Sequence, residues 1–120
     1  MGVFSQALKD EVSSLAESRW EGSIGGNDVV LVAKPLSPLD MQAVTKKHRD
    51  FMSNPNVEGM VDLIMRKARA EGADTVAFEA VDRPYLMRLS MEKISGIFGA
   101  LFRDQLESDA DEEIEKQKGN

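Results

Sequence analysis

The chain has 120 residues, of which 42% are hydrophobic and none is cysteine. This length suits one compact domain, and the lack of cysteine excludes a disulfide framework and a thiolate metal site. The formal net charge is −6, but the segment 104–120 holds seven acidic and two basic residues, which leaves a net −1 on the rest of the chain. A nearly neutral body argues against nucleic acid as the main ligand, because phosphate binding needs a basic surface.

The first residues lack the basic and then apolar order of a secretory signal peptide. No apolar run approaches the roughly 20 residues that a membrane-spanning helix needs. We therefore expect a cytoplasmic protein that does not contact a membrane.

Residues 4–19 form the first predicted element. Phe4, Leu8, Val12 and Leu15 recur at helical intervals, and polar residues fill the opposite face. The apolar stripe is narrow for a helix that packs on a core. We expect residues 1–19 to contain an amphipathic helix that docks weakly on its own domain or docks on a partner.

A β-hairpin is predicted next. Gly25, Gly26 and Asn27 are typical turn residues, and the β-branched run 29–32 follows them. The segment 20–24 should therefore pair with 28–34. Pro35 should end the second strand, because proline has no N–H for the strand ladder.

Two helices are expected to follow the hairpin. Ser37 is a predicted N-cap with Asp40 at the capping-box position, and this helix should run to about Met52. Asn54 should cap a second helix that begins at Pro55 and ends near residue 71, where Gly72 is a stop signal. The segment 73–81 is ambiguous between an edge strand and a loop anchored by a Phe, and we favour the loop.

Asp82 should cap one long helix that runs to about Gln105. Val81 and Leu86 stand at the positions of a hydrophobic staple. Glycines within the helix predict close packing against another backbone. The expected buried residues of this helix are Leu86, Leu89 or Ser90, Ile94, Ile97, Phe98, Leu101 and Phe102.

The predicted organisation has three parts. Residues 1–19 are an N-terminal amphipathic helix, 20–105 are a hairpin with a helical core, and 106–120 are an acidic tail without the apolar residues to fold. The fold class is mainly α with a short N-terminal β-hairpin (α+β), with about four helices.

Residues suited to catalysis are few. The single histidine, His48, lies in the basic run 46–49, where a solvated surface residue is the more common case. No Gly-x-Ser-x-Gly nucleophile motif is present, and the acidic cluster 109–115 lacks the glycine of a calcium loop. We expect no enzymatic activity, no metal and no cofactor.

The seven methionines point to a binding surface, because the methionine side chain adapts to varied partners. For any single methionine, the alternative is that it fills a gap in the core. The candidate protein-binding residues are Met41, Met52, Met60, Met65, Met87, Met91, Phe98 and Phe102.

The order of the predicted elements resembles the tail assembly chaperones of long-tailed bacteriophages. The resemblance depends on a hairpin that leads through the segment 32–41 (VAKPLSPLDM) into a helix, followed by a second helix. It also depends on Phe78, Asp82 and Leu86, which precede the final helix. The resemblance covers residues 20–105 and leaves the N-terminal helix unexplained. It implies a chaperone in the host cytoplasm that self-associates and keeps the tape measure protein soluble until tail tube protein polymerises around it.

Two other functions stay open at this point. One is a structural neck or tail completion protein that remains in the virion. The other is a small regulatory protein that places the basic segments 46–49 and 66–69 on nucleic acid, although acidic residues close by in the sequence favour ordinary helix surfaces.

Overall fold

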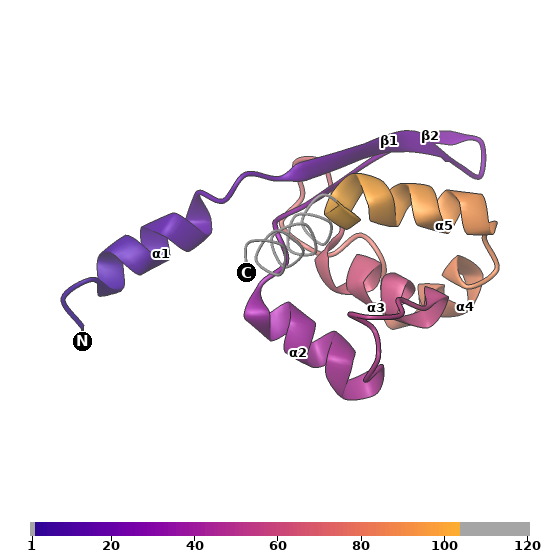
Figure 1. Cartoon of the computed structure of the whole chain (residues 1–120). Coiled ribbons are helices and arrows are strands. Elements are labelled where there is room, and N and C mark those ends of the chain that lie inside the picture. The colour runs from indigo at the N-terminus through magenta and orange to yellow at the C-terminus, as the bar shows by residue number, and fades with distance from the viewer. Residues whose placement is uncertain (1, 104–120) are drawn as a thin grey trace, which may run out of the picture.

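A computed structural model of the chain describes residues 2–103, so the predicted tail 106–120 lies outside the described residues. It confirms an α+β fold with the hairpin near the N-terminus (Figure 1). The described residues contain five α-helices, where about four helices were expected. The elements are α1 (Ser5–Ser13), β1 (Ser18–Ile24), β2 (Asn27–Ala33), α2 (Pro38–Lys47), α3 (Val57–Lys67), β3 (Arg69–Ala70), a 3₁₀ turn (Ala80–Asp82), α4 (Arg83–Leu86), α5 (Met91–Phe98) and a π-helical turn (Gly99–Arg103).

The predicted hairpin is confirmed. Strands β1 and β2 pair antiparallel, with Trp20 opposite Leu31. Gly25 and Gly26 form the turn with φ of 61° and 79°. Positive φ at both central residues defines the type I′ turn, whose twist matches that of the strands.

A third strand lies where a helix was predicted. Helix α3 ends at Lys67, and Ala68 has an extended ψ of 135°. Strand β3 then pairs with the free edge of β2, with Ala70 opposite Leu31. The predicted helix end near residue 71 is therefore wrong, because pairing satisfies backbone groups that β2 would otherwise leave open. Gly72, with φ of 82°, lies in the turn after β3.

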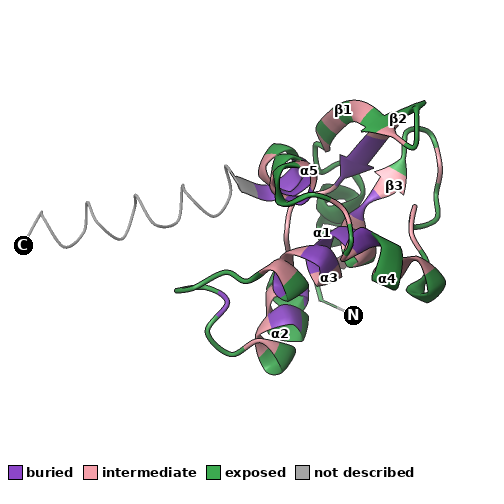
Figure 2. Ribbon diagram, turned by 90° about the vertical axis from the view of Figure 1, so that its right-hand side faces the viewer, coloured by how far each residue is buried: buried purple, intermediate pink, exposed green. Residues whose placement is uncertain are grey.

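The core lies between the sheet and helices α3 and α5. Figure 1 shows α5 running beneath the β1–β2 hairpin, and Figure 2 shows buried residues on β2, α3 and α5. The residues of the predicted final helix that were expected to be buried are buried, with one exception. At the position given as Leu89 or Ser90, Leu89 is half-buried and Ser90 is exposed. The confirmed ones are Leu86, Ile94, Ile97, Phe98, Leu101 and Phe102.

The start of α2 follows its capping signal. Ser37 Oγ accepts the Asp40 N–H at 3.2 Å, and the Asp40 carboxylate accepts the Ser37 N–H at 2.9 Å. The helix ends at Lys47 and does not reach Met52. The N-cap of α3 is Asn56, whose side chain accepts the Gly59 N–H, and this corrects the prediction of Asn54.

The predicted long helix 82–105 is broken into α4 and α5. Ser90 has extended backbone angles, and its Oγ accepts the Lys93 N–H at 3.1 Å. The serine hydroxyl thus caps a new helix where the hydrophobic spacing indicated a continuous one. The staple is also wrong, because Val81 is 68% exposed. Asp82 does not cap α4 through its side chain, since its carboxylate accepts the Glu79 N–H.

An added methyl group should have opposite effects on the free energy of unfolding at Gly59 and at Gly96. A Cβ on Gly59 would lie 2.5 Å from Cδ2 of the buried Phe51, whereas a Cβ on the exposed Gly96 would lie 4.0 Å from the nearest atom, Nε1 of Trp20. Gly59→Ala should lower the free energy of unfolding by about 1–2 kcal/mol through overpacking. Gly96→Ala should raise it by up to about 1 kcal/mol through helix propensity.

Urea unfolding of both variants, followed by circular dichroism, measures the two effects. Both substitutions add one methyl group inside an α-helix, so each controls for the other. Shifts of the same sign and size would contradict the close contact between α3 and Phe51.

Candidate protein-binding surface

Helix α1 projects away from the rest of the chain (Figure 1). None of its residues is buried. Its link to the body includes Lys34, whose Nζ donates to the backbone oxygens of Val12 at 3.5 Å and Ser13 at 3.3 Å. The apolar stripe is uncovered, with exposures of 73% for Phe4, 66% for Leu8, 61% for Val12 and 36% for Leu15.

Helix α1 has little support of its own. It spans nine residues, has no side-chain cap, and lacks an acidic residue in its first turn and a basic residue in its last turn. Isolated helices shorter than about 12–15 residues are marginal in water. A helix this short gains most of its stability from whatever covers its apolar face, so the stripe is a candidate binding surface.

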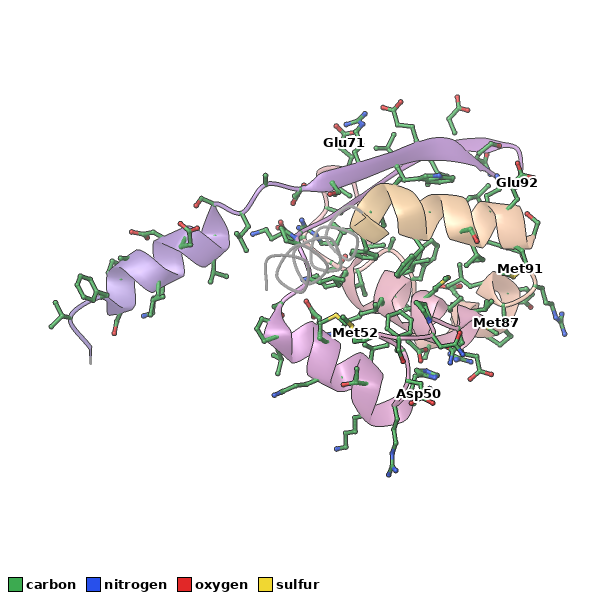
Figure 3. The ribbon with its side chains drawn as sticks, viewed as in Figure 1. Asp50, Met52, Glu71, Met87, Met91 and Glu92 are labelled. Carbon is green, nitrogen blue, oxygen red and sulfur yellow. The ribbon has the colours of Figure 1, made fainter. Side chains whose placement is uncertain are left out.

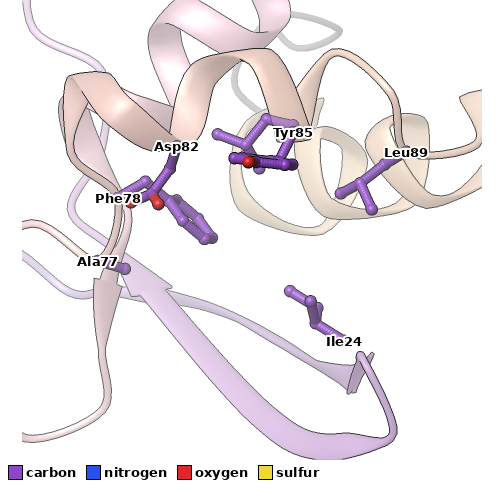
Figure 4. Close-up of a pocket in the computed structure, with 7 residues that line it drawn as sticks. Ile24, Ala77, Phe78, Asp82, Tyr85 and Leu89 are labelled. Carbon is purple, nitrogen blue, oxygen red and sulfur yellow. The ribbon is translucent and has the colours of Figure 1, made fainter.

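A second apolar surface lies at the tip of the hairpin. We call it the hairpin-tip groove; its volume is about 400 Å³, and Ile24 of β1 faces Tyr85 and Leu89 across it (Figure 4). Its rim carries Tyr85, 67% exposed, and the neighbouring Val81 is 68% exposed. The lining residues are Ile24, Ala77, Phe78, Asp82, Tyr85, Leu86 and Leu89.

The chemistry of this groove suits an apolar side chain or helix face. Six of its seven lining residues are aliphatic or aromatic. The exception is Asp82, whose carboxylate is held by the Glu79 N–H at 2.8 Å. Pockets with mostly apolar walls and few placed polar groups are typical binding sites. Sequence reasoning singled out Phe78 and Asp82 as anchors but missed the groove, because its far wall comes from Ile24.

The predicted methionines divide into two classes. Met52 and Met91 are exposed at 54% and 56%. The other four, Met41, Met60, Met65 and Met87, are half-buried and pack against the core. Figure 3 places Met87 and Met91 near the junction of α4 and α5, and Met52 close to α2. The two exposed methionines, Met52 and Met91, therefore lie apart from each other.

Phe98 and Phe102 were predicted to bind a partner, and the structure instead places them in the core. They are 5% and 1% exposed. Phe98 packs edge-on against Phe51 with ring centroids 6.2 Å apart, and Phe102 lies 5.5 Å from Phe98. Aromatic side chains of this size dominate the burial of a small core. Neither ring is offered to a partner, so we remove both from the candidate surface.

Asp40 joins the start of α2 to the end of α3. Its carboxylate accepts from Arg66 Nε at 2.7 Å and Lys67 Nζ at 3.0 Å, in addition to the Ser37 N–H. Burial alone would raise the pKa of Asp40, but the hydrogen bonds from the Ser37 backbone, Arg66 and Lys67 lower it to about 2. The ionised carboxylate is therefore the form that the fold stabilises.

Asp62 joins three helical segments. It lies 2.8 Å from His48 Nε2, 3.2 Å from Arg83 Nε and 3.5 Å from Lys47 Nζ. Burial acts to raise the pKa of Asp62, but the contacts with His48, Arg83 and Lys47 outweigh it and lower the pKa. The side chain of His48 is only 7% exposed, so its prediction as a solvated residue was wrong. No sequence signal placed Asp62 beside it.

These contacts assign structural roles to much of the basic charge on α2 and α3. Within residues 2–103, no group of three His, Cys, Asp or Glu could hold a metal ion. No helix of that part of the chain is long and apolar enough to cross a bilayer. Comparison with protein-family models, with curated proteins and with solved structures found no match.

Asp40→Asn should lower the free energy of unfolding by about 2 kcal/mol at pH 7, since the folded state holds the pKa well below the unfolded value of about 3.9. A lowered pKa gives stability that is complete above about pH 4 and is lost as the pH falls towards 2. The difference between the natural chain and the variant should shrink over that interval.

Denaturant unfolding at a series of pH values measures this difference. Asp50→Asn serves as the control, because Asp50 is an exposed residue that follows the same helix. A difference between Asp40→Asn and the natural chain that stays constant from pH 7 to pH 2 would show that the charge of Asp40 does not stabilise the fold.

Proposed function

We propose that the chain is a binding protein for an amphipathic helix, which it receives in the hairpin-tip groove. The observation that carries this proposal is the exposure of large apolar side chains around a groove with apolar walls. Tyr85 is two-thirds exposed at its edge, and Val81 and Val76, nearby in the chain, are 68% and 47% exposed. Contiguous apolar surface on a soluble protein is typical of an interaction site, and an apolar groove is a common receptor for a helix.

We further propose that the helical partner is a phage tape measure protein, and that the chain acts as a tail assembly chaperone. The support is the resemblance in element order. The hairpin, the Ser37-capped helix, the second helix and the Phe78 segment follow one another along the chain. The break at Ser90 departs from the single final helix that the resemblance implies. Phe78 and Asp82, two of the matching residues, line the groove.

The charge arrangement gives less support to a nucleic-acid ligand. Arg66 and Lys67 are paired with Asp40, and Lys47 is paired with Asp62. Asp40 offsets one of the two positive charges of Arg66 and Lys67, and Asp62, which also contacts Arg83, offsets part of the positive charge beside Lys47. A basic surface built from the segments 46–49 and 66–69 is therefore weaker than the sequence alone indicates.

Co-expression with the tape measure protein encoded in the same genome tests the proposal. The natural chain should co-purify with it and raise its soluble fraction. Val81→Ser with Tyr85→Ser should weaken co-purification, because Tyr85 lines the groove, the exposed Val81 precedes the lining residue Asp82, and a truncated interface anchor typically costs about 1–3 kcal/mol. Leu39→Ser is the control, since Leu39 on α2 is equally exposed at 66%.

Three outcomes would count against the proposal. No gain in tape measure solubility would reject the chaperone function, and equal losses for the groove and control variants would reject the groove as the site. Stoichiometric presence of the chain in purified virions, measured by mass spectrometry, would favour a structural neck or tail completion protein.

A further inference from the structure

We propose that the hairpin-tip groove of one copy receives helix α1 of a second copy, so that two chains exchange their N-terminal helices. This goes beyond the proposed function, because it names an occupant that the chain itself supplies and does not depend on the identity of any other partner. The two surfaces match in chemistry. One is a helix with a narrow apolar stripe, and the other is a groove with mostly apolar walls.

The distribution of exposed apolar side chains singles out these two surfaces. Eleven large hydrophobic residues are exposed within residues 2–103; five of them lie between residues 3 and 15, and Tyr85 lies at the groove. Helix α1 is too short to be stable alone, and Phe4 at its start is the most exposed aromatic of the set. Docking would cover both apolar surfaces at once, and it would supply the burial that α1 lacks.

The direction of α1 favours a second copy over the chain's own groove. Lys34 binds the carbonyls at the C-terminal end of α1, and Glu17 forms an ion pair with Arg69 beside the sheet. The groove begins at Ile24, at the other end of β1, which spans about 20 Å. Folding α1 back along the sheet would break these contacts, whereas a second copy can be approached without breaking them.

Symmetry also favours exchange between copies. Each chain carries a net charge of −6, of which −5 lies in residues 104–120, so apolar contact and not charge has to hold two copies together. In a two-fold arrangement, α1 of each copy would lie in the groove of the other copy, and the assembly would close as a dimer. The surface that one docked helix of nine residues buries is small compared with the ~1,200 Å² typical of stable interfaces. Reciprocal exchange doubles the buried surface, because two helices dock.

The first experiment measures dimer dissociation of the full chain by analytical ultracentrifugation. Phe4→Ser with Leu8→Ser should raise the dissociation constant at least about tenfold, because it removes two large apolar side chains from each contact. Gln6→Ser with Asp10→Ser, on the polar face of the same helix, is the matched control and should leave the constant nearly unchanged. A chain that stays monomeric at all concentrations, or equal effects of the two pairs, would overturn the proposal.

The second experiment locates the contact by cross-linking, which is clean because the chain contains no cysteine. A tagged Leu8→Cys chain is mixed with an untagged Tyr85→Cys chain and treated with a short thiol-specific cross-linker. Mixed dimers should form much faster than with Leu39→Cys in place of Tyr85→Cys, at matched exposure of 66% and 67%. Equal rates would overturn the proposal, and so would a Leu8→Cys, Tyr85→Cys double variant that cross-links only within one chain.

Discussion

Two carboxylates hold the short helices of this fold around α3. Asp40 ties α2 to the C-terminal end of α3, and Asp62 ties α3 to His48 and to α4. The apolar contribution of these helices is small, since α2 buries Val44 and α4 buries Leu86 as their only buried hydrophobic residues. One buried aliphatic side chain contributes about 1.5–3 kcal/mol, and the charge of Asp40 contributes a similar amount, about 2 kcal/mol. Charge and apolar burial therefore both decide where α2 and α4 lie.

This constraint shapes the remaining surface. Asp62 binds Arg83, which is the first residue of α4, and Tyr85 and Leu86 follow in the same helix. Leu86 points into the core, which leaves Tyr85 at the edge of the hairpin-tip groove. The ion pair between Arg83 and Asp62 therefore helps to hold the wall of the groove that this helix of four residues provides. The exposed apolar rim is a consequence of how α4 is anchored.

Local signals in the sequence predicted the parts of the fold that local physics decides. The Gly25–Gly26 turn, the Ser37–Asp40 capping box and the spacing of the buried residues from Ile94 to Phe102 were all predicted correctly. In each case, the deciding interactions join residues that are close along the chain. The α+β class followed from the same signals.

The failures involve contacts between distant segments. Strand β3 forms because β2 offers an open edge, and periodicity within residues 55–71 carries no record of that edge. His48 is covered because Asp62 comes to it from another helix. At Ser90, two local signals competed, and the cap outweighed the continuous apolar spacing. The groove was missed because it is formed between distant segments: Ile24 lies more than 50 positions before the other residues that line it.

The uncovered α1 and the hairpin-tip groove are best understood together. A groove that accepts one amphipathic helix accepts others, because apolar contact is not directional. If α1 of a second copy fills the groove, an incoming partner helix must displace it. A displaceable occupant has to bind weakly, and α1 has the features of one: nine residues, no side-chain cap and a narrow stripe. A longer partner helix with a continuous apolar stripe buries more apolar surface, so it binds the groove more tightly and displaces α1. In that arrangement the exchanged helices protect the apolar groove until a partner arrives, which is the property that a chaperone needs to stay soluble alone.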